Sequence, residues 1–433
     1  MFKLRTALAL AFALIVGAAA AQQSLTFWTS LTYPIDVEAL QTIVDEFNAA
    51  NPDLEVELVQ VPGSDVNDVS KLMTAVAGGT GPDIYMLDRF TVAQRAAAGL
   101  LTDLGDRIDP GAADAFLEFA WNEVLFQGDA YGVPFDTDVR ALYYNRDMID
   151  AAGVDASALD PANGVPSLED VERIAQALNE TDDQGNYTQV GFIPWVGQGQ
   201  PYTWGFAFGG DFYDEAACRL TPDSEEIVAS MAWVDDWAGM LGRDEIVNYI
   251  STFSSGAGPI AWSGQIPPAQ NPFITGRLGM VAEGDWFVAN LERYAPDMEF
   301  GVTYLPSPTG EVASWSGGWA MVMPTGTEDE DAAYRFIEHI TGTQGQRTYA
   351  EMTSHFPTRA ELLEDDAIYE GRRAFLRTIL DGSHARPALP VGGQYWGELR
   401  GAQEETVLDR MAPEEALERV VSRVQPRLDE YCD

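Results

Sequence analysis

The chain has 433 residues, of which 46% are hydrophobic and 11% aromatic, so it is long enough for two packed domains and is not disordered. It carries 68 acidic and 25 basic residues, and the formal net charge of −43 disfavours nucleic acid and anionic membranes as partners. Its three histidines lack the spacing of metal ligands, so the sequence predicts no metal site and no cofactor and offers little material for histidine-based catalysis.

Residues 1–21 differ from the rest of the chain. They read MFKLRTALALAFALIVGAAAA, with Lys3 and Arg5 first, then an apolar run, then small residues. This pattern is typical of a secretory signal peptide with an Ala-x-Ala exit. No cysteine follows the exit, so we expect a soluble periplasmic or secreted protein that starts at Gln22 and has no lipid anchor.

Two cysteines are present, Cys218 and Cys432. In an oxidising compartment, an even pair of this kind favours a disulfide bond. Two unrelated buried thiols are the alternative, and both interpretations remain open at this point.

The N-terminal part of the chain alternates strands and helices. Strands are predicted where residues are apolar or alternate between apolar and polar, over 24–30, 54–61 and 82–87. Helices are predicted where apolar residues recur at helical spacing, over 36–49, 68–79 and 91–101. This rhythm predicts a parallel sheet covered by helices, which is an α/β fold.

The same rhythm restarts in the middle of the chain. A hairpin and a strand are predicted over 128–145, and further strands over 189–195, 276–286 and 300–307. Helices are predicted over 146–154, 167–180, 224–240, 329–342, 344–353 and 413–431. No tandem repeat or low-complexity linker separates the two parts, so we expect two α/β lobes that the chain connects by strand-like crossings.

One stretch is unusually aromatic. Residues 198–214 read QGQPYTWGFAFGGDFYD, in which six of seventeen residues are aromatic and four are glycine. One interpretation is an aromatic loop that fills core space. The other is a surface on which a sugar stacks, because the C–H groups of a sugar lie well against a ring.

Five motifs occur in an order that points to a known family. They are KLMTAVAGGTGPDIYMLDRF, YGVPFDTDVRALYYNRDMIDAAGV, ITGRLGMVAEGDW, SWSGGWAMVMPTGTEDEDAAYRFIEHITG and FPTR. This order resembles the extracellular solute-binding proteins of ABC importers, family 1, and more closely their maltose-binding type of carbohydrate binder. The resemblance covers nearly all of the chain after the signal peptide.

The resemblance implies a periplasmic-binding-protein type II fold with two α/β lobes, a multi-crossing hinge and a ligand cleft between the lobes. It places the N-terminal lobe at 22–136 plus 317–355 and the C-terminal lobe at 137–316 plus 356–433. Both cysteines then fall in the C-terminal lobe, which is compatible with their pairing. The implied partners are a sugar of one to three units and the transmembrane subunits of an ABC permease, and the protein is expected to be a monomer without enzyme activity.

Polar ligand residues are expected at the ends of strands. Asp88 follows a predicted strand, and the carboxyl ends of strands face the ligand crevice in open α/β sheets. It matches a sugar-binding aspartate of the resembled type, and Arg89 beside it matches as well. Asp138 matches the acidic ligand residue of the family, with Asp136 as a close competitor. The alternatives are a helix cap for Asp88 and a salt bridge with Arg140 for the other two.

Aromatic ligand residues are expected mainly on the C-terminal lobe. Tyr202 and Trp204 correspond to a Pro-Tyr-aromatic segment of the family, while Phe206 and Phe208 are expected in the core. Three further tryptophans are candidates for stacking, namely Trp286, Trp315 and Trp396, and burial in the core is the alternative for Trp286.

The remaining candidates lie at the second crossing and in the first loop. Gly317 and Gly318 can offer backbone N–H groups and absorb a hinge rotation. Tyr33 and Trp28 are candidates of the N-terminal lobe, where the sequence departs from the maltose-binding pattern, so a different sugar or linkage is expected.

Three other functions remain open from the sequence. One is the binding of another small polar solute, such as a glycerol phosphate, a polyamine or a compatible solute. A phosphate would use basic residues, namely Arg89, Arg140, Arg359 and Arg386. A secreted glycoside hydrolase also combines paired carboxylates with aromatic subsites, but the order of motifs disfavours it. A sensor that reports on its ligand to a receptor would have the same sequence features.

Overall fold

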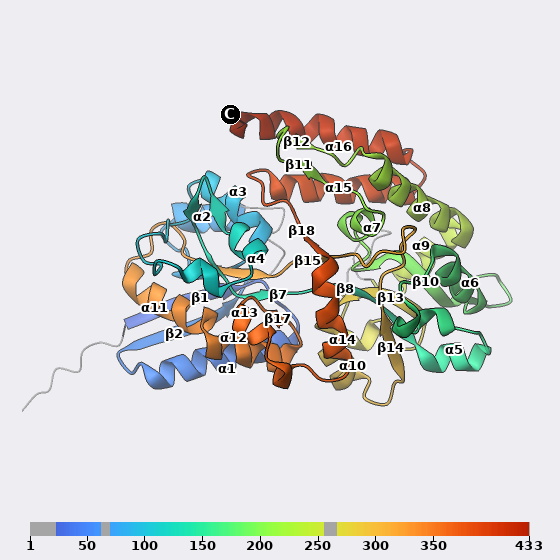
Figure 1. Cartoon of the computed structure of the whole chain (residues 1–433), viewed down its shortest axis with the longest axis horizontal. Helices are drawn as coiled ribbons and strands as arrows, with labels where there is room; N and C mark the ends of the chain where they lie inside the picture. The colour runs from blue at the N-terminus through green and yellow to red at the C-terminus, as the bar shows by residue number, and fades with distance from the viewer. Residues whose placement is uncertain (1–22, 62–69, 255–265, 433) are drawn as a thin grey trace, which may run out of the picture.

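The computed structural model describes residues 23–61, 70–254 and 266–432, so the predicted signal peptide lies outside the described residues (Figure 1). Two mixed sheets, each with its own helices, form two lobes, which confirms the predicted α/β fold class. No helix of the described ranges combines the length and apolar character that crossing a membrane requires.

The sheet of the N-terminal lobe has the order β2-β1-β3-β16-β6. Its strands are β1 (Gln23–Thr29), β2 (Leu54–Gln60), β3 (Ile84–Asp88), β6 (Val133–Pro134) and β16 (Trp319–Val322). The first three are parallel, as predicted, and β16 runs antiparallel to β3. The helices of this lobe are α1 (Pro34–Ala50), α2 (Ser70–Ala77), α3 (Val92–Ala97), α4 (Glu118–Asn122), α11 (Glu330–Thr341) and α12 (Thr343–Thr353).

Alternation along β3 explains why this sheet is covered on both faces. Ile84 and Met86 pack into one buried cluster with residues of α1 and α11, whereas Tyr85 and Leu87 pack into another with residues of α2 and α3. Because side chains of a strand point to opposite faces in turn, four consecutive apolar residues require helices on both sides.

The sheet of the C-terminal lobe has the order β14-β8-β13-β10-β9. Its strands are β8 (Arg140–Asn145), β9 (Glu180–Thr181), β10 (Tyr187–Gly197), β13 (Leu278–Gly284) and β14 (Phe300–Thr303). The helices of this lobe are α5 (Arg146–Ala152), α6 (Leu168–Ala177), α7 (Pro201–Ala207), α8 (Glu225–Leu241), α9 (Arg243–Ser251), α10 (Phe287–Tyr294), α13 (Ala360–Leu363), α14 (Arg372–Ile379), α15 (Gly392–Val407) and α16 (Pro413–Leu428).

Short strands connect the lobes. β7 (Asp136–Thr137) pairs with β17 (Phe356–Pro357), and β15 (Ser314–Ser316) pairs with β18 (Ser383–Ala385) (Figure 1). The chain passes from β15 to β16 through Gly317 and Gly318, and a Cβ atom at Gly318 would lie 2.3 Å from the carbonyl oxygen of Asp136. The strands of each sheet fall inside the ranges predicted for one lobe, and those boundaries stay a prediction.

The predicted disulfide is confirmed. Cys218 bonds to Cys432 and thereby fastens the C-terminus, which follows α16, to the hairpin of β11 (Tyr213–Asp214) and β12 (Arg219–Leu220). Figure 1 shows α15 and α16 side by side along the top of the molecule. The ring of Tyr431 lies 6.4 Å from that of Phe126 in β4 (Leu125–Phe126), so the fastened C-terminus reaches the N-terminal lobe.

Candidate functional site

The predicted ligand residues come from several elements that end at the junction of the two lobes. Asp88 is the last residue of β3, and Trp286 lies two residues after the end of β13. Asp138 lies between β7 and β8, and Trp315 is in β15. Trp396 is in α15, which contacts α3 of the N-terminal lobe.

The guanidinium of Arg89 bonds to groups of the protein itself. Its side chain is completely buried, and its Nε donates a hydrogen bond of 2.8 Å to Glu123 Oε2. Its two Nη groups donate to the carbonyl oxygens of Asp136 and Gly317. Arg89 therefore ties the end of β3 to two of the chain crossings.

Asp88 makes an ion pair across the junction. Nη2 of Arg386 donates to Asp88 Oδ1, and Arg386 belongs to the segment that follows β18 in the C-terminal lobe. A cavity of about 10 Å³ lies beside Asp88 and is also lined by Ser30, Arg95 and Trp319. A larger recess of about 460 Å³ lies near Asn145 at the far end of β8, so it is not part of the junction.

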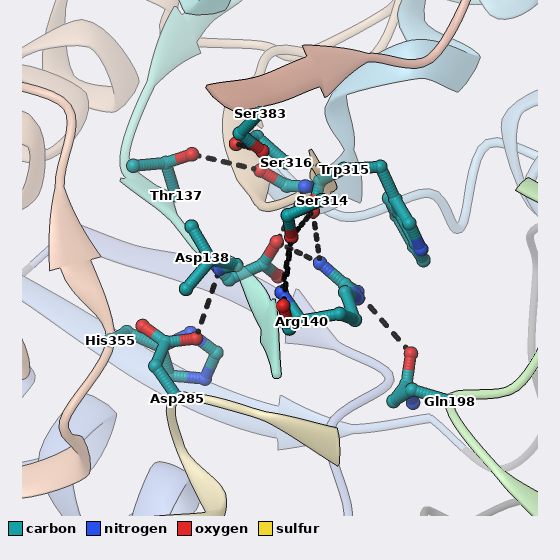
Figure 2. A network of polar contacts seen from close by, with 12 residues as sticks. Thr137, Asp138, Arg140, Gln198, Asp285, Ser314, Trp315, Ser316, His355 and Ser383 are labelled. Carbon is teal, nitrogen blue, oxygen red and sulfur yellow. Dashed lines mark hydrogen bonds and ion pairs between the residues drawn. The ribbon is translucent and has the colours of Figure 1, made fainter. Parts of the chain in front are cut away.

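Asp138 and Arg140 form a second buried ion pair, which Figure 2 shows beside Trp315. The backbone N–H of Gly317 also donates to Asp138 Oδ1. Burial acts to raise the pKa of Asp138, but Arg140 and then His355 act in the opposite direction and leave that pKa below its usual value. Asp138 is therefore an ionised carboxylate whose charge Arg140 balances.

Two tryptophans flank the guanidinium of Arg140. Its Cζ lies 3.3 Å from the ring centroid of Trp315 and 5.1 Å from that of Trp286. Trp286 also stacks on His355, with centroids 5.2 Å apart. The structure thus brings Asp138, Trp286 and Trp315 together around one cation.

His355, the stacking partner of Trp286, lies near several carboxyl side chains. His355 Nδ1 lies 3.3 Å from Asp136 Oδ2, and its Nε2 lies 4.0 Å from Asp36 Oδ1. Asp285, which directly precedes Trp286, accepts a hydrogen bond of 3.4 Å from the backbone N–H of Val139 (Figure 2). We call Asp36, Asp136, Asp285 and His355 the hinge cluster.

Burial decides the protonation of the hinge cluster. It raises the pKa of Asp36 to about 7 and lowers that of His355 to about 4. Burial, followed by repulsion from Asp138, also raises the pKa values of Asp136 and Asp285 well above their usual range. Burial thus favours the uncharged form of each of these groups and leaves the imidazole of His355 neutral at pH 7.

The aromatic candidates separate into two groups. Tyr202 stacks on Trp396 with centroids 5.5 Å apart and also contacts Trp315, whose Nε1 donates to Thr203 Oγ1 at 2.8 Å. Trp204 instead packs in the core of the C-terminal lobe, and its Nε1 donates to the carbonyl oxygen of Pro194. Phe206 and Phe208 are buried as expected.

The remaining candidates are Tyr33 and Trp28 of the N-terminal lobe and the two glycines of the crossing. Tyr33 is partly buried and directly precedes α1, and Trp28 contacts the ring of Tyr85. The amide of Gly317 bonds to Asp138, and its carbonyl accepts from Thr137 Oγ1 at 3.2 Å. Gly318 has a φ of +123°, a conformation that favours glycine.

Sequence reasoning did not assign four residues of the junction to the site. The sequence indicates Arg386 only as one of several possible phosphate ligands, and Asp36 only as part of a helix. Asp285 stands between Gly284 and Trp286 in the GDW motif. Its position directly after a strand could have indicated a site residue. His355 has no comparable local signal, because its neighbours Asp36, Asp136 and Trp286 are distant in sequence.

A two-lobed α/β molecule with ion pairs and rings at the junction of its lobes is the architecture of a solute-binding protein. The chain belongs to the bacterial extracellular solute-binding protein family, whose sequence profile matches residues 42–372. The family predicted from the order of motifs is thereby confirmed.

Individual relatives agree with this assignment. The maltotriose-binding protein of Pyrococcus abyssi is 24% identical over 381 residues, which cover 87% of this chain and 76% of that protein. A probable ABC transporter-binding protein of Deinococcus radiodurans is 23% identical over 354 residues, 78% of each chain.

Solved structures share the fold. The structure of CpMnBP1 with mannobiose bound aligns with a TM-score of 0.81 at 24% identity and covers 93% of this chain and 100% of that one. The GacH receptor of Streptomyces glaucescens aligns with a TM-score of 0.76 at 22% identity, covering 94% of this chain and 99% of the other.

Proposed function

We propose that this protein is the sugar-binding component of an ABC importer. It captures an uncharged sugar of one to three units between its lobes and delivers it to the membrane permease, without chemical turnover. The observation that carries the proposal is the meeting of two aspartates that are paired with arginine, Asp88 and Asp138, with three tryptophans at one junction.

This set of groups suits a neutral polyol. A carboxylate accepts hydrogen bonds from sugar hydroxyls, and such charge-assisted bonds are stronger than neutral ones. Tryptophan faces pack against the apolar side of the sugar ring. Arginine N–H groups beside the carboxylates supply donors for the ring and hydroxyl oxygens.

A phosphate ligand fits the junction less well. The charges of Arg140 and Arg386 are already balanced by Asp138 and Asp88, and Arg89 is paired with Glu123. Arg359 lies elsewhere, over the ring of Phe116, where its Nε donates to the carbonyl oxygen of Thr341. To pair with one of these three junction arginines, a phosphate would have to displace the carboxylate that already pairs with it.

Capture by lobe closure follows from where the contacts lie. Asp88 and Phe90 come from the N-terminal lobe, whereas Arg386, Trp315 and Trp396 come from the C-terminal lobe. A ligand that touches both sets binds the closed arrangement better than an open one and shifts the population toward it. Gly317 and Gly318 lie between β15 and β16, where a rotation of the lobes needs backbone freedom.

The relatives support the choice of ligand and partner. Proteins named for binding maltotriose and arabinooligosaccharide match most of this chain, and another is named as a probable ABC transporter-binding protein.

A periplasmic or secreted location and removal of residues 1–21 are part of the proposal. The disulfide is consistent with that location because such bonds persist in oxidising compartments.

A thermal-shift screen tests the proposal. We expect one or more of a set of mono-, di- and trisaccharides to raise the melting temperature, because a ligand of the folded state stabilises by mass action. Glycerol phosphates are screened in parallel, and calorimetry then gives the affinity and stoichiometry. Stabilisation by glycerol phosphate alone, or by no sugar, would overturn the proposal. Catalytic release of product from a labelled oligosaccharide would instead identify a glycoside hydrolase.

A further inference from the structure

Arg386 bridges the two lobes at the end of the site formed by Asp88. Its Nη2 donates to one oxygen of Asp88, Oδ1. The side chain of Arg386 is only 2% exposed, while that of Asp88 is 16% exposed. The cation is therefore buried, whereas the carboxylate that it balances keeps some access to the solvent.

Three rings hold the guanidinium of Arg386 in place. Its Cζ lies 3.9 Å from the ring centroid of Phe90, 4.5 Å from that of Trp315 and 5.4 Å from that of Trp396. These distances are in the range of cation–π attraction, which strengthens where water is excluded. A Cβ atom on Gly317 would lie 3.1 Å from Nη2 of Arg386, so the backbone at Gly317 also lies close to the guanidinium.

The charge of Arg386 acts on more than Asp88. Burial acts to raise the pKa of Asp138, and Arg386 helps to lower it, after the larger contributions of Arg140, His355 and the amide of Gly317. Arg386 also opposes the rise that burial causes in the pKa of Glu123. Arg386 is thus a central positive charge at a junction rich in carboxyl groups.

We infer that Arg386 is a specificity-determining residue, which makes the site select uncharged sugars over basic ones. The inference rests on the proposed function. With Arg386 in place, Asp88 offers its second oxygen to a hydroxyl group while the net charge of the pair is zero. Without Arg386, the partly buried carboxylate of Asp88 loses the cation that donates to it, and a ligand amino group satisfies it better than a hydroxyl does.

Arg386→Met tests the inference because methionine keeps much of the apolar volume and removes the charge. The probes are maltotriose and mannobiose, each beside derivatives in which one hydroxyl is replaced by an amino group, measured at a pH at which the amine is protonated. We expect the variant to bind the neutral sugar about tenfold or more weakly. For at least one amino derivative, the ratio of neutral to basic affinity should shift toward the basic sugar by about tenfold or more.

Arg386→Lys and Arg372→Met are the matched controls. The lysine variant retains the charge, so its neutral-to-basic ratio should stay near that of the unaltered protein even if both affinities fall. Arg372 also lies 3.9 Å over a ring, that of Phe300, but on α14 outside the junction. Its replacement should leave both affinities unchanged.

Asp88→Asn provides an independent variant should Arg386→Met not fold. Asparagine removes the negative charge that balances Arg386. The ratio of neutral to basic affinity should therefore shift in the opposite direction, in favour of the neutral sugar. An equal loss of affinity for both kinds of sugar in Arg386→Met and in Asp88→Asn would overturn the inference and leave sugar binding intact. Failure of the unaltered protein to bind any sugar would overturn the proposed function and the inference together.

Discussion

The two ends of the candidate site neutralise buried carboxyl groups in different ways. At Asp88 and Asp138, an arginine lies against the carboxylate and balances its charge. In the hinge cluster, His355 is uncharged at pH 7 because burial lowers its pKa to about 4, and burial raises the pKa values of the surrounding aspartates. The first end thus offers carboxylates that are paired with arginine, whereas at the second end burial shifts the pKa of each group toward its uncharged form.

The largest effect is expected from breaking a buried ion pair at the first end. Asp138→Leu leaves Arg140 buried between two tryptophans without its carboxylate. We expect a loss of about 3–5 kcal/mol in the free energy of unfolding, because an uncompensated buried charge is costly. Chemical denaturation measures this loss, and the double variant Asp138→Leu with Arg140→Met should recover part of it. No recovery in the double variant would show that the ion pair is not the cause.

The next effect concerns the rings at the same end. Trp286→Ala removes one of the two rings near the guanidinium of Arg140 and the stacking partner of His355. If Trp286 stacks on the sugar, binding should weaken by about 1–3 kcal/mol, as for other aromatic anchors. Calorimetry measures the affinity, with Trp204→Phe in the core of the C-terminal lobe as the control. Unchanged affinity together with a lower melting temperature would assign Trp286 to the core alone.

A pH series sharpens the contrast between the two ends. The pKa of Asp36 is raised to about 7, so its contribution to stability is fully present below the ordinary carboxyl range and is lost as pH rises through 7. The raised pKa values of Asp136 and Asp285 act in the same direction. His355 acts in the opposite direction: its depressed pKa gives stability above about 6.5 that is lost as pH falls through about 4.

Asp36→Asn isolates one of these contributions. We expect the variant to gain stability relative to the unaltered protein between pH 5 and pH 8, by about 2 kcal/mol or more, because the asparagine carries no charge to bury. The measurement is the free energy of unfolding of both proteins at the two pH values. A constant difference between the two proteins would mean that Asp36 is not protonated in the folded state.

Sequence patterns predicted the sheet strands well and some helices poorly. The β1–β3 strands were found because their residues alternate or are uniformly apolar. The helix α7 was missed because all seven of its residues are buried, so it has no polar face and no helical period. The helix α15 begins with two glycines, which weaken the signal of a helix start.

The candidate site was predictable where a residue ends a strand and not where it depends on a distant partner. Asp88 is the last residue of β3 and Trp286 follows β13, and the structure places both at the junction of the lobes. Arg386 is 298 positions away from Asp88, so no local pattern connects them. A single sequence also gives no sign that burial in the hinge cluster raises the pKa of Asp36.

The smallest effect is expected from an ion pair that also crosses the lobes but lies on the surface. Arg293 in α10 makes two hydrogen bonds, of 2.7 and 2.9 Å, to the carboxylate of Glu38 in α1. Both side chains are about half exposed, so water and salt screen the attraction. Arg293→Ala should change sugar affinity by no more than about twofold, and the change should vanish at high salt. A loss as large as that of Arg386→Met would mean that the rim, and not the buried pair, holds the lobes closed.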